Sequence, residues 1–401
     1  MTADERWDPI RSNPPSSARG ISRVSRVETF STFGGVRNWI FVRIHTDDGL
    51  YGWGEASTEL WDHTVLAAIG ELGGRLLGMD ALASESAWQQ LHRHGFWRGG
   101  AIASTALAAI DQALWDIRGK RLGVPVYRLL GGPTRQWVRT YRHVGIYRPE
   151  AIATDAEQLV REGVRMMKTG AWVGDSVLGE TERVRRFADN FAALRDLVGP
   201  EVDLVIDNHG RSRPDEAIRL IRAIAPYRPL WIEEPISPES PELVRAVAWE
   251  ARLHGISMAL GERLYSRSDA KNVLEAQLVD VLQPDLCHAG GITEVIKMAA
   301  FADVYRCVIA PHNPGGPVST AAAAHVAMAT PNFLVLEFCP DEPRRSQITV
   351  DPWRYEGDRL WVPDSPGLGV DLDIDALLET PAQQIAVPST AFALDGSVAD
   401  I

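Results

Sequence analysis

The sequence has few cysteines and no long apolar run, and each absence excludes a class of protein. Its three cysteines, Cys287, Cys307 and Cys339, include no Cys-x-x-Cys pair, so we expect neither a disulfide framework nor a zinc ribbon. No segment approaches the ~20 consecutive apolar residues that cross a bilayer. Residues 1–20 contain no apolar core of a secretory signal. We therefore expect a cytoplasmic protein whose residues 1–20 form a flexible N-terminal extension.

Clusters of positive charge are also missing. The chain carries 41 Lys and Arg against 53 Asp and Glu, a net charge of −12, and no long basic run occurs. Nucleic acids and anionic membranes bind clustered cations, so we expect neither as a partner. With 45% hydrophobic and 23% charged residues the composition is that of a globular protein, and 401 residues predict two or three domains.

A glycine-rich phosphate loop is absent as well. Neither G-x-G-x-x-G nor a P-loop occurs, which argues against an open doubly wound sheet. Beyond Pro133, short apolar strands alternate with amphipathic helices, and each strand ends in a polar residue. The strand ends are between 23 residues (262 to 285) and 39 residues (168 to 207) apart, the spacing of a (β/α)8 barrel. The predicted strands are 138–143, 164–168, 202–207, 230–233, 257–262, 280–285, 307–312 and 333–337.

The first 130 residues show a different pattern. Alternating apolar residues from Trp39 to His45, followed by the turn Asp47-Asp48-Gly49, predict an antiparallel hairpin that continues into residues 52–55. Apolar residues at three- and four-residue spacing predict helices at 61–79, 85–95 and 102–121. We predict an α+β domain at 21–130, a barrel domain at 131–350, and a C-terminal segment at 351–401 that packs back on the N-terminal domain.

Three predicted strands in succession end in a carboxylate: Asp207, Glu233 and Glu262. The carboxyl ends of parallel barrel strands converge on one face, so these side chains should lie together. Three oxygen ligands suit a hard cation such as Mg²⁺, with positions left open for a substrate. A carboxylate at a strand end can also cap the next helix, but three in a row favour a metal site.

The next two strands end in Asp285 and His312, which can hydrogen-bond as neighbours. The carboxylate would orient the imidazole and raise its basicity, so we interpret the pair as a general base. His209 lies two residues after Asp207 and, in an extended segment, would face the same mouth as a general acid or a nitrogen metal ligand. The oxygen triad favours the acid.

Three further strand ends carry polar residues. Glu337 on the last strand could donate or accept a hydrogen bond with a substrate oxygen. Lys168 on the second strand could pair with a substrate carboxylate, although a lysine at a strand end is often only solvated. His143 on the first strand also faces the mouth and is a further substrate-binding candidate, although the pattern assigns it no specific role.

Together these residues resemble the enolase superfamily, in its mandelate racemase branch. Within that branch the chain is similar to the D-galactonate dehydratases and related sugar-acid dehydratases, over about residues 21–375. The strings that carry this closer resemblance are Ala108–Ile117, Gly261–Arg263, Gln283–Thr293 and Ser365–Gly369.

The resemblance implies an α/β fold: a modified TIM barrel, (β/α)7β, closed by an α+β capping domain made of the N-terminal residues and the C-terminal tail. It also implies one Mg²⁺ per subunit, held by Asp207, Glu233 and Glu262, and a homo-oligomer between a dimer and an octamer. The shared reaction step removes a proton next to a carboxylate. An imidazole base can do so only when the metal and fixed donors stabilise the resulting charge.

The resemblance further implies a role for each residue and a sugar acid such as D-galactonate as the small-molecule substrate. His312, held by Asp285, removes the C2 proton. Lys168 helps to bind the carboxylate, and Glu337 hydrogen-bonds the enediolate. His209 protonates the departing 3-hydroxyl, and the product is a 2-keto-3-deoxy acid.

The chain also departs from its relatives in places. Racemases of the branch have Lys-x-Lys at the second strand end, whereas this chain has Lys168-Thr169-Gly170, so a second base is missing and elimination is favoured. The loops after Lys168, around Asn208 and after His312 differ from those of the galactonate enzymes, which leaves the particular sugar acid open. Substrate-binding candidates in the capping domain are Asn38, Trp39, Trp97 and Arg98, and a packing role explains the last two equally well.

Three other functions stay open. An epimerase, racemase or cycloisomerase of sugar acids would use the same proton abstraction and would exchange solvent deuterium without a keto product. A metal-dependent barrel hydrolase would use mostly histidine ligands, and the oxygen triad argues against it. The non-enzymatic alternative is a barrel that binds sugar acids without turnover, and the filled catalytic positions argue against that.

Overall fold

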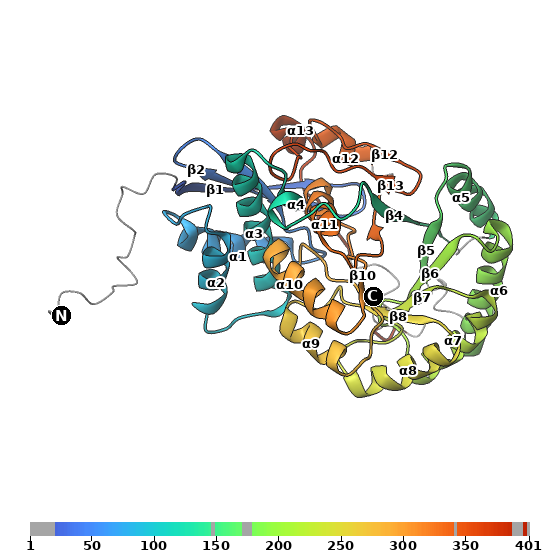
Figure 1. Cartoon of the computed structure of the whole chain (residues 1–401). Helices are drawn as coiled ribbons and strands as arrows, with labels where there is room; N and C mark the ends of the chain where they lie inside the picture. Colours follow the sequence, from blue (N-terminus) through green and yellow to red (C-terminus); the bar gives the residue numbers. More distant parts are fainter. Residues whose placement is uncertain (1–20, 146–148, 171–178, 341–342, 387–395, 399–401) are drawn as a thin grey trace.

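The computed structural model describes residues 21–145, 149–170, 179–340, 343–386 and 396–398. Its N-terminal part is an α+β capping domain that lies beside the barrel in Figure 1. An antiparallel sheet in the order β1 (Val24–Phe33), β2 (Asn38–Thr46), β3 (Tyr51–Glu55) comes first. Helices α1 (Asp62–Leu76), α2 (Ser84–Arg93), α3 (Gly100–Leu122) and the short α4 (Val126–Leu129) follow.

These elements follow the apolar patterns in the sequence. Helices α1, α2 and α3 begin within two residues of the predicted starts at 61, 85 and 102. Strands β2 and β3 form the predicted hairpin, with His45 opposite Tyr51. Strand β1 pairs with the other edge of β2, where Phe33 lies opposite Asn38, so the sheet has one strand more than the hairpin.

Parallel strands form a closed ring in the second part of the described chain. They are β4 (Val138–His143), β5 (Met166–Gly170), β6 (Asp203–Asp207), β7 (Trp231–Glu233), β8 (Ser257–Leu260), β9 (Val281–Leu282), β10 (Val308–Ile309) and β11 (Leu336–Glu337). From β4 to β10 each strand pairs with the next. A bridge between Ile309 and Phe333 and the pairing of β11 with β4, where Leu336 lies opposite Thr140, complete the ring.

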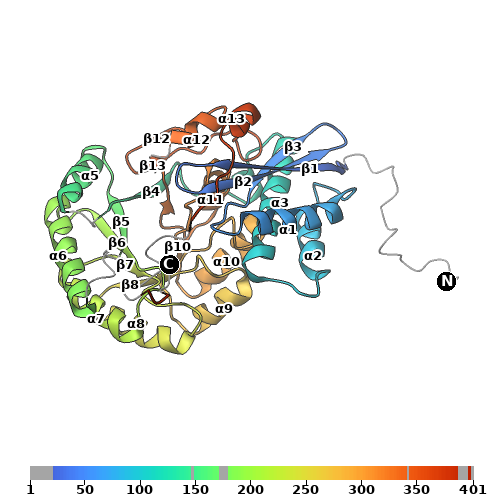
Figure 2. The ribbon, with the colours of Figure 1, turned by 180° about the vertical axis from the view of Figure 1, so that it is seen from behind.

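Helices connect the strands and cover the outside of the ring, as the arc from α5 to α9 shows in Figure 2. They are α5 (Pro149–Arg161), α6 (Glu180–Val198), α7 (Pro214–Ile224), which continues into a 3-10 turn at Ala225–Tyr227, α8 (Pro241–Leu253), α9 (Arg267–Glu275), α10 (Gly291–Val304) and α11 (Pro317–Ala329). In the described chain only the short α12 (Pro343–Ile348) follows β11 closely. The fold is therefore the expected (β/α)7β variant of the TIM barrel with a capping domain.

One apolar side chain from each strand or its immediate end fills the barrel interior. The set is Tyr141, Met166, Val205, Trp231, Ala259, Val281, Ala310 and Val335, all buried. The rings of Tyr141 and Trp231 meet edge to face with centroids 6.1 Å apart, and the small alanines complement them. We call this set the apolar floor, because the site described below lies on top of it.

The C-terminal residues contact both parts of the molecule. The hairpin of β12 (Tyr355–Glu356) and β13 (Arg359–Leu360) pairs with the start of β4, where Arg359 lies opposite Arg139, and helix α13 (Ile374–Glu379) lies against β1. Thr380 O accepts a hydrogen bond of 2.6 Å from Thr32 Oγ1, and Asp371 Oδ1 accepts one of 2.6 Å from Trp53 Nε1. The boundaries drawn at 130 and 350 stay predictions.

Helix α3 is buried between the capping sheet and the barrel. Gly52 and Gly54 of β3 allow this close packing, because a Cβ at either position would lie within 2.2 Å of an α3 carbonyl oxygen. Polar side chains on α3 bond to the barrel: Gln112 Nε2 donates to Leu286 O at 2.8 Å, and Asp111 Oδ2 accepts from the Thr293 N–H at 2.9 Å. Neither α3 nor any other helix of the described chain combines the length and apolarity that a membrane span requires.

Candidate active site

The residues two positions beyond the apolar floor form a second layer at the carboxyl ends of the strands. Alternate residues of a strand face the same side, so these side chains point into the barrel mouth. We call them the polar layer. Its members are His143, Lys168, Asp207, Glu233, Gly261, Gln283, His312 and Glu337.

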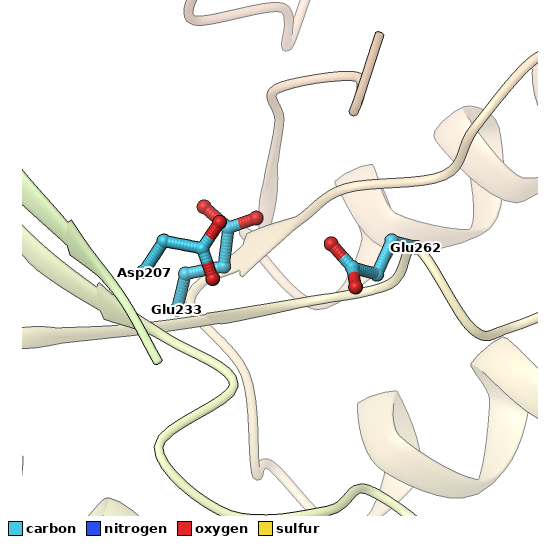
Figure 3. A group of neighbouring side chains, drawn as sticks. All are labelled: Asp207, Glu233 and Glu262. Atoms are coloured by element: carbon cyan, nitrogen blue, oxygen red, sulfur yellow. The ribbon is translucent and has the colours of Figure 1, made fainter. Parts of the chain in front are cut away.

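Two members of the polar layer and Glu262 form a carboxylate triad. Asp207, Glu233 and Glu262 each offer an oxygen within 4.8 Å of those of the other two. Figure 3 shows Asp207 beside Glu233, with Glu262 facing them across a gap. Glycine is required at 261, because its φ is +152° and a Cβ there would lie 2.6 Å from the backbone nitrogen of Gln283.

The oxygens of the triad fit a hard divalent cation. Glu233 Oε2 and Glu262 Oε2 are buried, and within the described residues neither accepts a hydrogen bond. Burial, together with the charge of Asp207, raises the pKa of Glu233 to about 7. Buried carboxylate oxygens without donors are unfavourable unless a proton or a cation compensates them, so the donor set matches the oxygen coordination of Mg²⁺.

Lys168 is buried between three carboxylates. Its Nζ lies 2.7 Å from Asp207 Oδ2, 3.0 Å from Glu233 Oε1 and 3.2 Å from Glu337 Oε1. Burial alone would lower the pKa of Lys168, but these charges raise it well above its usual value. The site therefore contains a fixed ammonium group beside the triad.

His312 and Asp285 form a hydrogen-bonded pair at the ends of neighbouring strands. His312 Nδ1 is 2.7 Å from Asp285 Oδ2, while Asp285 Oδ1 accepts a bond of 2.6 Å from the Cys287 N–H. The second ring nitrogen, Nε2, lies 3.3 Å from Glu262 Oε2 and 3.9 Å from Glu337 Oε2. Burial would lower the pKa of His312, but the surrounding carboxylates raise it well above its usual value.

His209 reaches the triad by a different backbone from the one expected. Its φ is +48°, so residues 207–209 are not extended. The imidazole Nε2 nevertheless lies 3.0 Å from Asp207 Oδ2, and 45% of the side chain is exposed. The left-handed turn is anchored by buried Asn208, whose amide donates to Pro235 O at 2.6 Å. A partly exposed imidazole therefore lies at the rim of the site.

Glu337 lies at the centre of a group of donors. Its Oε1 is 2.7 Å from His143 Nε2, and its Oε2 accepts a bond of 2.8 Å from the Asn313 N–H. Burial alone would raise the pKa of Glu337, but Lys168, His312 and His143 hold it well below its usual value. His143, to which the sequence pattern assigned no role, is thus a partner of Glu337.

The candidates from the capping domain are not brought together. Asn38 donates to Gln383 O at 2.7 Å and accepts from the Gln383 N–H at 2.9 Å, so the C-terminal tail occupies its amide. Trp39 is fully buried against Gly316, in the loop after β10. Trp97 and Arg98 line a cavity of about 480 Å³ between α1, α2 and α3, and its described lining includes no member of the polar layer.

Gln283 belongs to the polar layer but is not among the site residues predicted from the strand ends. It is fully buried, and neither Oε1 nor Nε2 has a hydrogen-bond partner among the described residues. The signal in the sequence is its position two residues after Val281, on the same face of the strand. The sequence pattern does not single out Gln283, because the charged group at this strand end is Asp285, two residues further on.

Two family descriptions match the chain. Residues 26–131 match the mandelate racemase / muconate lactonizing enzyme N-terminal domain, and residues 151–376 match the enolase C-terminal domain-like family. The first range covers most of the capping domain, and the second covers the barrel from α5 onward.

Curated relatives match over most of their length. The D-galactonate dehydratase of Variovorax paradoxus (strain S110) is 39% identical over 363 residues, which cover 89% of this chain and 94% of that protein. The D-galactonate dehydratase of Ralstonia pickettii (strain 12J) is 40% identical over 373 residues, 90% of this chain and 96% of that protein.

Solved structures share the fold. A crystal structure of an enolase from Agrobacterium radiobacter, with sodium and L-malate bound, has a TM-score of 0.86 and 32% identity, covering 94% of this chain and 99% of that one. The 3,6-anhydro-D-galactonate cycloisomerase from Zobellia galactanivorans has a TM-score of 0.82 and 32% identity, covering 90% of this chain and all of that one.

Proposed function

Because the chain belongs to the mandelate racemase / muconate lactonizing enzyme family of the enolase superfamily, we propose that it is a magnesium-dependent dehydratase of D-galactonate or a similar aldonic acid. It is a sugar-acid hydro-lyase, in line with relatives 39% and 40% identical over nearly their whole length. The observation that carries the finer proposal is the meeting of the carboxylate triad, the His312–Asp285 pair and His209 in one site.

Asp207, Glu233 and Glu262 would hold one Mg²⁺ per subunit. When bound, the cation supplies positive charge that stabilises the negative charge developing on the substrate carboxylate. The buried Glu233 Oε2, which accepts no hydrogen bond within the described residues, supports this assignment. The remaining steps belong to side chains of this protein.

His312 acts as the base. It takes the C2 proton at Nε2, because Asp285 occupies Nδ1 and fixes the orientation of the ring. The charges of Glu262 and Glu337 raise the pKa of His312, so the imidazole must lose a proton before it can accept one. Neutralising these carboxylates in the loaded enzyme lowers that pKa toward the range in which a base works.

Lys168 and Glu337 bind the substrate carboxylate. The Lys168 ammonium pairs with it directly, since it is the buried cation of the site. An incoming carboxylate adds negative charge beside Glu337 and raises its pKa, so Glu337 takes the proton of His143, whose Nε2 is 2.7 Å away. Protonated Glu337 then donates a hydrogen bond to the substrate oxygen, where charge builds up during proton removal.

His209 donates a proton to the departing 3-hydroxyl. Its imidazole is held at the rim by Asp207, and its exposed edge leaves room for the far end of a sugar acid. Gly170 occupies the face of β5 two residues after Lys168, where a second base would be needed for racemization. One base and one acid on the site favour elimination of water and ketonisation to a 2-keto-3-deoxy acid.

A substrate panel tests the proposal. The purified protein with Mg²⁺ is incubated with D-galactonate and with other C5 and C6 aldonic and aldaric acids, and 2-keto-3-deoxy product is measured with semicarbazide. Product from D-galactonate or one similar acid, lost with EDTA and with His312→Asn, is the expected result. Product from no acid would overturn the proposal.

A cycloisomerase is the second candidate, because a solved cycloisomerase shares the fold at a TM-score of 0.82. Loss of substrate without semicarbazide-reactive product would identify it. Deuterium incorporated at C2 of recovered substrate in D₂O, again without keto product, would identify an epimerase or racemase. We also propose that the enzyme works in the cytoplasm as a homo-oligomer.

A further inference from the structure

Glu55, at the end of β3 in the capping domain, caps a helix of the barrel. It is fully buried. Its Oε1 accepts a hydrogen bond of 2.5 Å from the Gly316 N–H, and its Oε2 accepts one of 2.8 Å from the Ser319 N–H. Gly316 is the N-cap residue of α11, and this end of the helix has no side-chain cap of its own. A carboxylate is favourable there because it pairs with free amide donors at the positive end of the helix.

Helix α11 begins directly after the loop that carries His312. Ser319 Oγ donates to Asn313 Oδ1 at 2.8 Å, and the Asn313 N–H donates to Glu337 Oε2 at 2.8 Å. The Asn313 amide also donates to Glu337 O at 3.0 Å. A continuous chain of hydrogen bonds therefore joins Glu55 to the residue next to His312 and to Glu337.

Two glycines make this approach possible. A Cβ at Gly316 would lie 2.9 Å from Glu55 Oε1, and one at Gly315 would lie 2.8 Å from the Cβ of Ser319. A side chain at either position would push the helix end away from the carboxylate. The loop sequence Asn313-Pro314-Gly315-Gly316 is thus fitted to Glu55.

We propose that Glu55 is a positioning residue of the active site, through which docking of the capping domain fixes the His312 loop. The inference rests on the proposed function only for the activity readout. Among the described residues, the hydrogen bonds of the Glu55 carboxylate come from Ser57, Gly316 and Ser319, none of which belongs to the polar layer. Glu55 holds α11 and Asn313 so that the His312 ring and Glu337 keep their relative placement.

Glu55→Gln tests the role. Glutamine keeps the shape of the side chain, but its NH₂ group would face the N–H of Gly316 or of Ser319, and two donors cannot hydrogen-bond to each other. We expect kcat to fall about 10- to 100-fold, because a small displacement of a catalytic group is enough for such a loss, with KM changed less than about threefold. The control is Asp116→Asn. Asp116 is equally buried. It accepts from the Trp53 N–H and the Leu368 N–H at 3.0 and 2.8 Å and pairs with Lys120 Nζ at 2.7 Å, so it holds β3 and the C-terminal segment and not the His312 loop.

A second readout does not depend on turnover. In protein labelled with ¹³C-histidine and loaded with Mg²⁺, the His312 signal is assigned by its loss in His312→Asn. We expect Glu55→Gln to shift or broaden that signal and Asp116→Asn to leave it in place, even where both variants lower Tm equally. An unchanged His312 signal in Glu55→Gln, or equal kcat in the two variants, would overturn the positioning role. Wild-type protein that turns over no acid would refute the proposed function alone, and the signal would still test Glu55.

Discussion

Replacing His209 best separates the two steps of the proposed reaction, which are removal of the C2 proton and loss of the 3-hydroxyl. His209→Asn leaves the His312–Asp285 pair untouched, so C2 proton removal should persist while loss of the 3-hydroxyl slows about 10²- to 10⁴-fold. Semicarbazide measures the product, and ¹H NMR in D₂O measures exchange at C2. His312→Asn is the matched control and should lose both. Full dehydration by His209→Asn would show that another group protonates the hydroxyl.

Gln283 offers a second test at this scale. Two unpaired amide atoms in a buried site cost on the order of 1–3 kcal/mol, and methionine has a similar volume without polar atoms. We expect Gln283→Met to keep or raise Tm while kcat/KM falls, because the amide faces the site.

Gln112→Met is the control for Gln283→Met. Gln112 is equally buried, but its Oε1 accepts from the Glu55 N–H at 3.0 Å and its Nε2 donates to Leu286 O at 2.8 Å. Thermal unfolding should show a lower Tm for Gln112→Met, since this variant loses two hydrogen bonds of the folded protein. A Tm loss as large in Gln283→Met would mean that its amide has partners in the folded protein.

At the scale of the element, Asp111 on α3 makes the stability of the protein depend on pH. Asp111 caps the start of α10, and burial raises its pKa to about 7, above the ordinary 3.8. The folded protein then holds this proton more tightly than the unfolded chain does. The protonated Asp111 carboxyl therefore stabilises the folded state fully below about pH 4, and this stabilisation is lost as the pH rises through 7.

Asp111→Asn should remove this loss of stability at rising pH, because asparagine does not titrate. Relative to wild type, the variant should gain on the order of 2–3 kcal/mol in free energy of unfolding between pH 5 and pH 8. Urea unfolding at both pH values measures the difference, in which the other titrating groups cancel. Parallel pH dependence of the two proteins would contradict the assigned pKa.

The sequence predicted the order of elements well and their lengths less well. Strand β4 has the predicted bounds, whereas β9 and β10 contain two residues each instead of six. Pro284 and Pro311 lack an N–H and end these ladders early. Strand β1 was not distinguished because, at the sheet edge, it fully buries only Val24 and Thr32 and shows no apolar alternation.

The same contrast holds in the site. The triad, His312 and Asp285 were predictable because parallel strands carry their last residues to one face. For Trp97 and Arg98 no such rule applies, because a local pattern cannot reveal which end of a second domain docks on the barrel, and their substrate-binding role stays a prediction. Likewise, no local pattern predicts that Glu55 caps helix α11, whose N-cap residue Gly316 lies 261 residues later in the chain.

For the whole molecule, binding of Mg²⁺ should raise stability. A ligand that binds only the folded state at 100 times its Kd adds about 2.7 kcal/mol. We expect MgCl₂ to raise Tm over EDTA-treated protein, and Glu262→Gln to abolish the shift because it removes one ligand charge. NaCl at equal ionic strength is the control. An equal Mg²⁺ shift in Glu262→Gln would mean that the cation binds elsewhere.

The C-terminal tail also has a consequence for synthesis on the ribosome. Thr32, on the edge strand β1 of the capping sheet, bonds to Thr380, 348 residues later, so this edge waits for its partner. At about 5–20 residues per second that wait lasts roughly 20–70 seconds. Strand β1, which is translated early, thus stays open to chaperones and to other nascent chains until the C-terminal tail has been made. The capping domain precedes the barrel in the chain, yet its sheet is completed only after the barrel has been translated.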